Sequence, residues 1–287
     1  MSPVTLPELR INSYDISIRI PDPFEQNIGS WRDAKGNLFA IIQIIKHQYW
    51  IHWINIASFH LNLHENVVSS YVFPEIKREL VDDIFQRNIL PYYLHLAGLE
   101  VLHASAVRSS MGVVGFCANS GSGKSTLAYA LSKQGKELWC DDALVISTSP
   151  TPPTVFKIPF YVRLLPDTYK FFLDGKYDNQ QLAQEVLPYP RTSTNKIKIA
   201  ELSKIIIMER IGKSKIDQID VIPLSPVQAF PNLIKHAYTI EIEEDVRKKR
   251  MLENYIDLTS KISVFKIKYP SNLNRIADLV DEILDLI

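Results

Sequence analysis

A glycine-rich stretch in the middle of the chain, CANSGSGKSTLAYAL (residues 117–131), has the residue types of a phosphate-binding loop. The N–H groups of a tight glycine turn, together with the N-terminus of a following helix, attract phosphate oxygens. The pattern G-x-x-x-x-G-K-[S/T] is matched at Gly123, Lys124 and Ser125, whereas its first glycine position holds Ala118. The stretch therefore predicts a nucleotide phosphate site, against the alternative of a glycine-rich helix start without a ligand.

The residues of this loop have different expected roles. Four small residues form the turn whose N–H groups point inward, namely Ser120, Gly121, Ser122 and Gly123. Lys124 reaches the β- and γ-phosphates as a point charge, and Ser125 is a ligand for Mg²⁺. We expect the turn from Ser120 onward to make the phosphate contacts, so Ala118 is compatible with binding.

Two adjacent carboxylates, Asp141 and Asp142, follow the loop in ELWCDDALVIS (residues 137–147), a stretch that predicts one strand. A carboxylate of this strand would face the phosphates if the strand neighbours the one before the loop. Neighbouring side chains of a strand point to opposite faces, so sharing one site requires an irregular backbone or a strand end. One carboxylate could hold Mg²⁺ while the other accepts the proton of an attacking hydroxyl. We assign the base to Asp141 and the metal to Asp142, although alternation does not fix that order. The alternative is an exposed charged turn.

Other polar residues are weaker candidates. His103, in the apolar stretch LHASAV one strand before the loop, has the structural role of a hydrogen-bonded histidine as its alternative. Arg163, Arg191 and Lys196 could reach phosphate oxygens, but solvated surface positions are the preferred interpretation.

The elements that must position these residues follow from hydrophobic periodicity. The N-terminal part predicts short strands over residues 14–20, 37–45, 49–56 and 59–64. Residues 74–98 then predict one helix, or two helices split near Pro91, with Gly98 at the end.

The remainder alternates strands and helices around the loop. Strands are expected over residues 100–107, 112–118, 137–147, 196–210, 217–225 and 262–270. Helices are expected over residues 125–135, 226–239, 243–261 and 271–287, the last with Ser271 or Asn272 as cap.

Composition excludes several classes of protein. The 287 residues include 32 basic and 32 acidic side chains, so no net charge attracts nucleic acid or an anionic membrane. The two cysteines do not suggest a disulfide framework, and no signal peptide is recognised at the N-terminus, so we expect a cytoplasmic protein. The most apolar segment, residues 38–57, is interrupted by Lys46, and we expect no membrane span.

The motifs taken together resemble the HPr kinase-like family, the relatives of the HPr kinase/phosphorylase. LHASAV, GFCANSGSGKSTLAYAL, G-x-x-L-x-x-DD and VRLLPDT occur here in that order. The resemblance covers His103 to about Asp167, and more weakly the C-terminal ISVFKIKYPSNLNRIADLVDEIL.

This resemblance implies an α/β fold: a mixed-sheet P-loop kinase domain of the phosphoenolpyruvate carboxykinase/HPr kinase type (residues 98–287) after a small β-rich N-terminal subdomain plus helix (residues 1–97). It implies that the loop, with Thr126 beside it, holds ATP and Mg²⁺, and that His103 and the acidic pair surround the γ-phosphate. The expected activity is γ-phosphoryl transfer to a hydroxyl, a serine of a small protein or peptide.

Two other functions remain open from the sequence. A nucleotide-binding regulatory module would need Lys124 but no carboxylate near the γ-phosphate. A small-molecule kinase or carboxykinase would need several arginines near the loop. Homo-oligomerisation is also left open.

Overall fold

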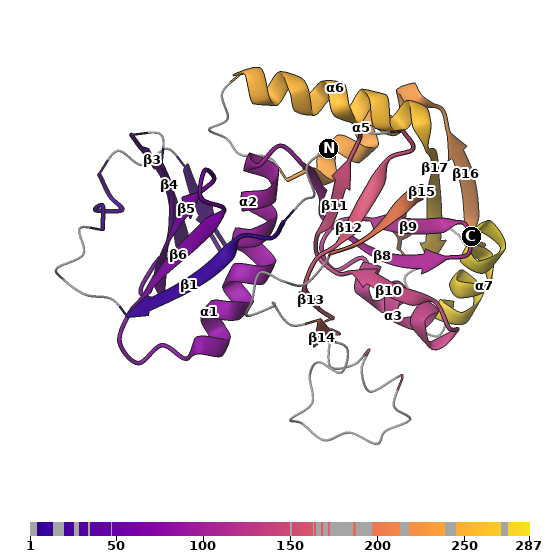
Figure 1. Ribbon diagram of the computed structural model, residues 1–287. Helices are drawn as coiled ribbons and strands as arrows, with labels where there is room; N and C mark the ends of the chain where they lie inside the picture. The colour runs from indigo at the N-terminus through magenta and orange to yellow at the C-terminus, as the bar shows by residue number, and fades with distance from the viewer. Residues whose placement is uncertain are drawn as a thin grey trace. The chain divides into compact units, whose positions relative to one another are not determined.

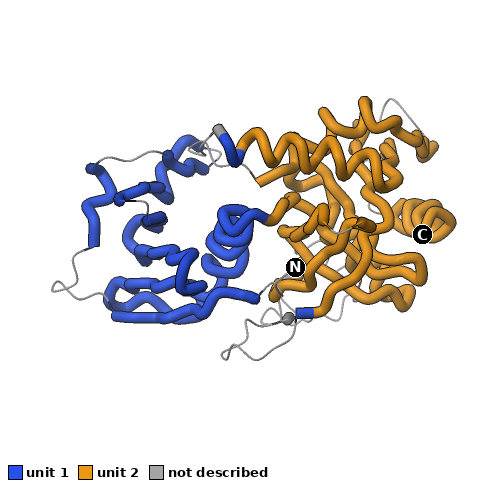
Figure 2. Tube along the Cα trace, turned by 45° about the horizontal axis from the view of Figure 1, so that its top comes forward, with its two compact units in different colours: residues 1–98, 189–197, 239–247 blue, residues 99–188, 198–238, 248–287 orange. Residues whose placement is uncertain are grey.

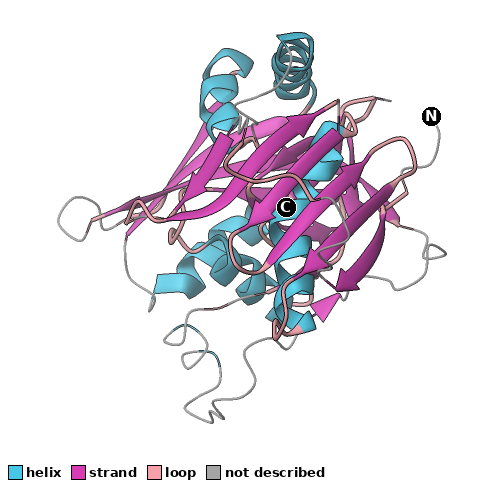
Figure 3. Ribbon diagram, turned by 90° about the vertical axis from the view of Figure 1, so that its left-hand side faces the viewer, coloured by secondary structure: helices cyan, strands magenta, loops and turns pink. Residues whose placement is uncertain are grey.

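The computed structural model shows a mixed α/β protein in which strands make up most of the regular structure (Figure 3). It describes residues 5–13, 20–25, 29–33, 35–46, 48–149, 151–162, 164, 168, 172, 186–187, 197–212, 218–238, 245–270 and 275–287. Contacts divide the chain into two compact units, which Figure 2 colours separately. The first comprises Met1–Gly98, Tyr189–Ile197 and Thr239–Arg247, and the second comprises Leu99–Pro188, Lys198–Tyr238 and Lys248–Ile287.

The first unit contains a six-stranded sheet in the order β1-β6-β5-β4-β3-β2, and all of these strands except β2 are labelled in Figure 1. Its strands are β1 Glu8–Ser13, β2 Gly29–Arg32, β3 Leu38–Ile45, β4 Gln48–Trp53, β5 Ala57–Asn62 and β6 Val67–Val72. β1 runs parallel to β6, and the other neighbours are antiparallel. The predictions of β3, β4 and β5 are confirmed, β1, β2 and β6 were not predicted, and the strand predicted over residues 14–20 lies almost entirely outside the described residues.

The helical segment of this unit does not break at Pro91. Helix α1 (Arg78–Ile84) continues through a π-helical turn (Phe85–Ile89) into α2 (Leu90–Leu96). The π turn shifts the hydrogen-bonding partners just before Pro91, which has no N–H to donate, so the helix continues. Its predicted end is confirmed by Gly98, which has a φ of 95°.

The second unit is built on a nine-stranded sheet in the order β10-β8-β9-β15-β12-β11-β7, with β17 on β15 and β16 on β17. Its strands are β7 Glu100–Leu102, β8 Ala104–Ser109, β9 Gly112–Cys117, β10 Glu137–Cys140, β11 Leu144–Ser147, β12 Thr154–Lys157, β15 Lys198–Ile211, β16 Asp220–Leu224 and β17 Ser263–Pro270. A separate pair joins β13 (Phe160–Tyr161) to β14 (Val186–Leu187). Strands β9, β15 and β17 are parallel, so their carboxyl ends lie at one edge of the sheet.

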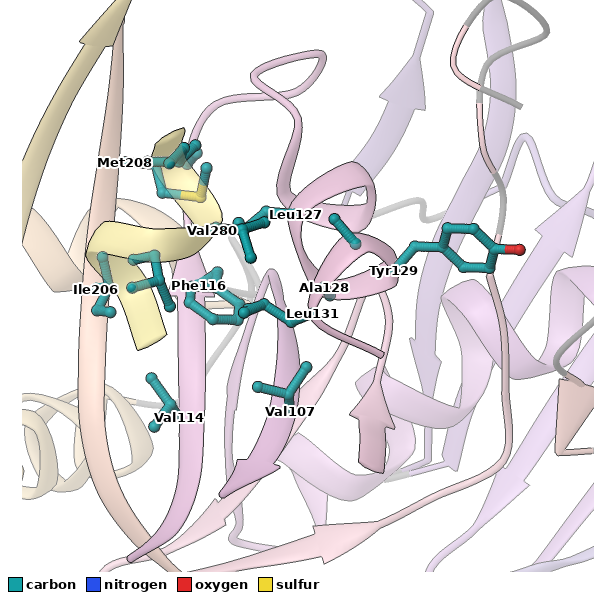
Figure 4. Packing of buried hydrophobic residues seen from close by; sticks show 14 of the residues in the cluster. Val107, Val114, Phe116, Leu127, Ala128, Tyr129, Leu131, Ile206, Met208 and Val280 are labelled. Atoms are coloured by element: carbon teal, nitrogen blue, oxygen red, sulfur yellow. The ribbon is translucent and has the colours of Figure 1, made fainter. Parts of the chain in front are cut away.

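Two groups of helices pack against this sheet. The helices are α3 Lys124–Lys133, α5 Pro226–Leu233, α6 Asp245–Lys261 and α7 Ile276–Leu286. Residues of β15 alternate between two cores: Ile206 packs with α3 and α7, and Ile205 packs with α5 and α6. Figure 4 shows the first of these cores, with Leu131 of α3 and Val280 of α7 around Phe116 of β9. The start of α3, which follows the glycine loop, is therefore anchored by a packed core.

Several expectations for this unit are tested by its elements. The strands predicted over residues 196–210, 217–225 and 262–270 and the four predicted helices are confirmed, with α5 continuing into a 3₁₀ turn and α7 beginning at Ile276. Ser271 and Asn272, the expected caps, lie outside the described residues. Cys117 and Cys140 are both buried and free. No helix within the described parts of the chain is long and apolar enough to cross a membrane.

Candidate active site

The sheet register brings the ends of three strands to one edge of the second unit. Ala104 at the start of β8 pairs with Cys117 at the end of β9, and Cys140 at the end of β10 pairs with Ala106. His103 precedes β8, the glycine loop follows β9 and the acidic pair follows β10, so the three candidate segments lie at the same edge. Strands β9 and β10 are not direct neighbours in the sheet, because β8 lies between them.

The loop between β9 and α3 has the backbone that a phosphate turn requires. Gly121 and Gly123 have φ values of 76° and 92°, which side chains with a Cβ rarely adopt. The Ser122 N–H donates to Asn119 O at 3.2 Å, and α3 begins directly at Lys124. The predicted order of strand, glycine turn and helix is confirmed.

Lys124 points back into the loop. Its Nζ donates to Ala118 O at 3.0 Å, and only 6% of the residue is exposed. Burial lowers the pKa of Lys124, while Asp142, Cys117 and Asp141 act in the opposite direction. The ammonium is thus desolvated and held by a neutral carbonyl, a partner that phosphate oxygens would replace with stronger, charge-assisted hydrogen bonds.

The role of Ala118 can be tested, because its hydrogen bond with Lys124 is made by its backbone carbonyl. An Ala118→Gly variant keeps that carbonyl, and we expect its ATP affinity to change by less than about tenfold. The matched variant Gly123→Ala places a Cβ at a φ of 92° and should weaken ATP binding more. Isothermal titration of both variants with ATP and Mg²⁺ measures the difference, and the reverse order of effects would contradict this view of the loop.

The acidic pair breaks the strand that was predicted over residues 137–147. β10 ends at Cys140 and β11 begins at Leu144, at a different position in the sheet. Between them, the Ala143 N–H donates to Asp141 O at 2.9 Å and Asp142 has a φ of 66°. A non-glycine residue in this region costs about 1–3 kcal/mol and persists only where its surroundings hold it. The backbone is irregular at the acidic pair, and the charges of both carboxylates act on Lys124.

The Asp141 carboxylate connects β8, β10 and α3. The Ser125 hydroxyl donates to Asp141 Oδ1 at 2.8 Å, and the Ser105 hydroxyl donates to the same oxygen at 2.5 Å. Asp141 is only 6% exposed, and Ser105 is fully buried. The structure thus places Asp141 on the Ser125 hydroxyl, where the sequence had suggested that Asp142 would share a metal with Ser125.

The turn at Asp142 is held through its backbone carbonyl. His103 Nδ1 lies 3.1 Å from Asp142 O, and since a carbonyl only accepts, this nitrogen carries the proton in the contact. The Tyr238 hydroxyl donates to the same carbonyl at 3.4 Å. The backbone N–H of His103 donates to the backbone carbonyl of His236 at 2.7 Å. His103 therefore contacts the backbone of the acidic turn.

Three residues of this region were missed by sequence reasoning. Ser105 could have been found, because alternation along the strand predicted over residues 100–107 puts it on the same face as His103. The structure interrupts that strand at His103, between the end of β7 at Leu102 and the start of β8 at Ala104. Tyr238 and His236 come from a distant segment without a recognisable motif. Burial, followed by the charges of Lys124, His103 and Lys235, lowers the pKa of His236 to about 4, so its imidazole is neutral near pH 7.

The structure says less about the remaining candidate residues. Thr126 is half-buried in the first turn of α3, beside Ser125. Arg163, Arg191 and Lys196 lie outside the described residues.

The donors at the loop fit a hard divalent cation. Among the described residues, no group of three or more His, Cys, Asp and Glu side chains is arranged to hold a metal. Mg²⁺ needs no such cage, because it binds through one or two protein oxygens, water and the substrate phosphates. The Ser125 hydroxyl and the Asp141 carboxylate supply oxygens of this kind.

The solved structures that match the chain include a kinase/phosphatase. The HPr(Ser) kinase/phosphatase from Coxiella burnetii is 16% identical to this chain, with a TM-score of 0.32, and the match covers 65% of this chain and 90% of that one. No protein-family model and no curated protein matches the chain. We base the function on the residues of the site, because a TM-score of 0.32 does not establish a shared fold.

Proposed function

We propose that this protein is an ATP-dependent phosphotransferase that moves the γ-phosphoryl group of ATP to a hydroxyl group. The observation that carries the proposal is the hydrogen bond from the Ser125 hydroxyl to Asp141 Oδ1 at 2.8 Å. Ser125 directly follows the phosphate loop, and Asp141 directly precedes Asp142, whose backbone has a positive φ. A loop that only binds nucleotide needs the glycine turn and Lys124. A transferase also needs carboxylates of different function near the terminal phosphate.

The loop and the start of α3 bind the nucleotide in this proposal. N–H groups of the loop and of the N-terminus of α3 donate to the phosphate oxygens, and Lys124 leaves Ala118 O for the β- and γ-phosphate oxygens. On this proposal the second unit is a P-loop kinase domain. The resemblance of the motifs further implies that the N-terminal subdomain, residues 1–97, faces the substrate or a partner.

We assign the metal to Ser125 and Asp141 and the general base to Asp142, which reverses the order suggested by the sequence. Mg²⁺, when bound, neutralises charge on the phosphates. Asp141 supports this assignment because its carboxylate already receives the Ser125 hydroxyl. Asp142 supports it because its charge acts on Lys124, and because His103 and Tyr238 hold its backbone carbonyl. His103 is then a positioning residue.

The chemical step balances with these groups. The acceptor oxygen forms a bond to the γ-phosphorus while the bond from that phosphorus to the β,γ-bridging oxygen breaks. The hydroxyl proton moves to the Asp142 carboxylate, and the electron pair of the broken bond leaves with ADP. Lys124 stabilises the charge on the phosphates throughout. The acceptor that the motifs imply is a serine of a small protein or peptide.

The proposal is tested by adding the purified protein, γ-labelled ATP and Mg²⁺ to an extract of its native cells. We expect one protein or peptide to gain label that resists acid and is released by alkali, as a phosphoserine does. Tight ATP binding without any labelled acceptor would support the regulatory module instead.

A further inference from the structure

Two side chains from neighbouring strands contact the glycine loop. Arg210 on β15 and Tyr269 on β17 are partners in the parallel register of these strands. Arg210 Nη1 donates to Gly121 O at 3.3 Å, and the Tyr269 hydroxyl donates to Ser122 O. Two successive carbonyls of the loop are therefore held by adjacent positions of the sheet.

These contacts fix the direction of the loop N–H groups. Across a planar trans peptide bond, the C=O and the next N–H point in opposite directions. A hydrogen bond from Tyr269 to Ser122 O consequently turns the Gly123 N–H away from the tyrosine. The hydrogen bond from Arg210 to Gly121 O likewise turns the Ser122 N–H away from the arginine, and this N–H faces Asn119 O inside the loop. Since glycine has several accessible backbone conformations, these contacts select one of them.

Tyr269 is suited to a permanent contact of this kind. Its ring belongs to the core beneath α3 and α7, and the residue is 8% exposed. Burial raises the pKa of the phenol to about 12, with the charge of Arg210 acting in the opposite direction. The hydroxyl therefore remains a donor at neutral pH, and packing keeps the ring in place when the hydroxyl is removed.

We propose that Tyr269 and Arg210 are positioning residues for nucleotide phosphate, which hold the carbonyls of Ser122 and Gly121 so that the Gly123 N–H faces the phosphate. This inference rests on the proposed nucleotide site and adds two residues to it from strands far from the loop in sequence. It predicts a loop that is organised before ATP binds, so that losing a contact costs affinity.

The Tyr269→Phe variant tests this inference, because it removes the donor and keeps the ring. We expect the Kd for ATP, and its KM, to rise about three- to tenfold, as for one lost hydrogen bond, while kcat is unchanged. The unchanged kcat follows because the loop holds the phosphates equally in the ground and transition states. Arg210→Ala, at an exposed position, should raise the same Kd and keep the fold.

Tyr255→Phe is the matched control. The Tyr255 hydroxyl of α6 donates to Val101 O at 3.1 Å, so the variant loses the same kind of hydrogen bond away from the loop. It should lower thermal stability without changing the ATP Kd. An ATP Kd in Tyr269→Phe equal to the wild-type value, or an equal loss in the control, would overturn the inference. If the wild-type protein itself binds no ATP, the proposed nucleotide site fails, and this inference fails with it.

Discussion

Replacing Lys124 with alanine is expected to weaken ATP binding by about 10- to 100-fold, the range of one or two charge-assisted hydrogen bonds. The side chain contributes little to the fold, because its one hydrogen bond is to the loop carbonyl of Ala118 and burial of its charge is itself unfavourable. Thermal stability should therefore stay at or slightly above the wild-type value. Isothermal titration with ATP and Mg²⁺, beside a thermal unfolding scan, measures both quantities.

Lys133→Ala provides the control for this variant. Lys133 belongs to the last turn of the same helix, and its ammonium lies 4.5 Å from the centre of the Tyr129 ring, far along α3 from the loop. We expect it to bind ATP as the wild-type protein does. Equal ATP affinity in Lys124→Ala and Lys133→Ala would show that the loop does not hold the nucleotide.

Replacing Asp142 with asparagine is expected to lower the rate of transfer by about 10²- to 10⁴-fold, the usual contribution of a general base. Asparagine has the same shape and is among the residues that tolerate a positive φ, so the turn should persist. ATP affinity should change little, since the loop and Lys124 supply the phosphate contacts. The measurement is the initial rate of label transfer to the labelled acceptor at saturating ATP.

Asp141→Asn separates the two carboxylates. If Asp141 holds Mg²⁺ with Ser125, its variant should require a higher Mg²⁺ concentration for half-maximal rate, and added Mg²⁺ should restore part of the activity. Asp142→Asn should show no such restoration. A variant of the exposed pair on α6, Asp257→Asn, controls for loss of a carboxylate elsewhere. If added Mg²⁺ restored activity in Asp142→Asn but not in Asp141→Asn, Asp142 would hold the metal and Asp141 would be the base, as the sequence suggested.

The local elements around the loop were predictable because each depends on nearby residues. The apolar run before the loop, the glycines at 121 and 123 and the periodicity after Lys124 specify strand, turn and helix without reference to the rest of the chain. The partners of the loop were not predictable in this way. Arg210 and Tyr269 reach the loop only because β15 and β17 extend the sheet beside β9. The order in which strands pair cannot be read from the residues of any one strand.

The acidic pair also depends on contacts that cannot be read from its own stretch of sequence. The apolar residues of ELWCDDALVIS on both sides of the acidic pair favour one continuous strand. The structure instead separates the segment into β10 and β11, which pair with different neighbours. Sequence reasoning recognised that two carboxylates need an irregular backbone to share a site. The choice between them depended on Ser125 and Ser105, whose contacts with Asp141 are set by the packing of α3 and β8.

The measurement that tests the central claim most directly compares the double variant Asp141→Asn/Asp142→Asn with the wild-type protein in transfer of label from γ-labelled ATP to the acceptor. ATP binding is titrated in parallel on the same samples. We expect the double variant to bind ATP through the loop and Lys124, within about tenfold of the wild-type affinity, while transfer falls by at least about 10²-fold. Transfer at the wild-type rate by the double variant would contradict the assignment of this site as a phosphotransferase centre.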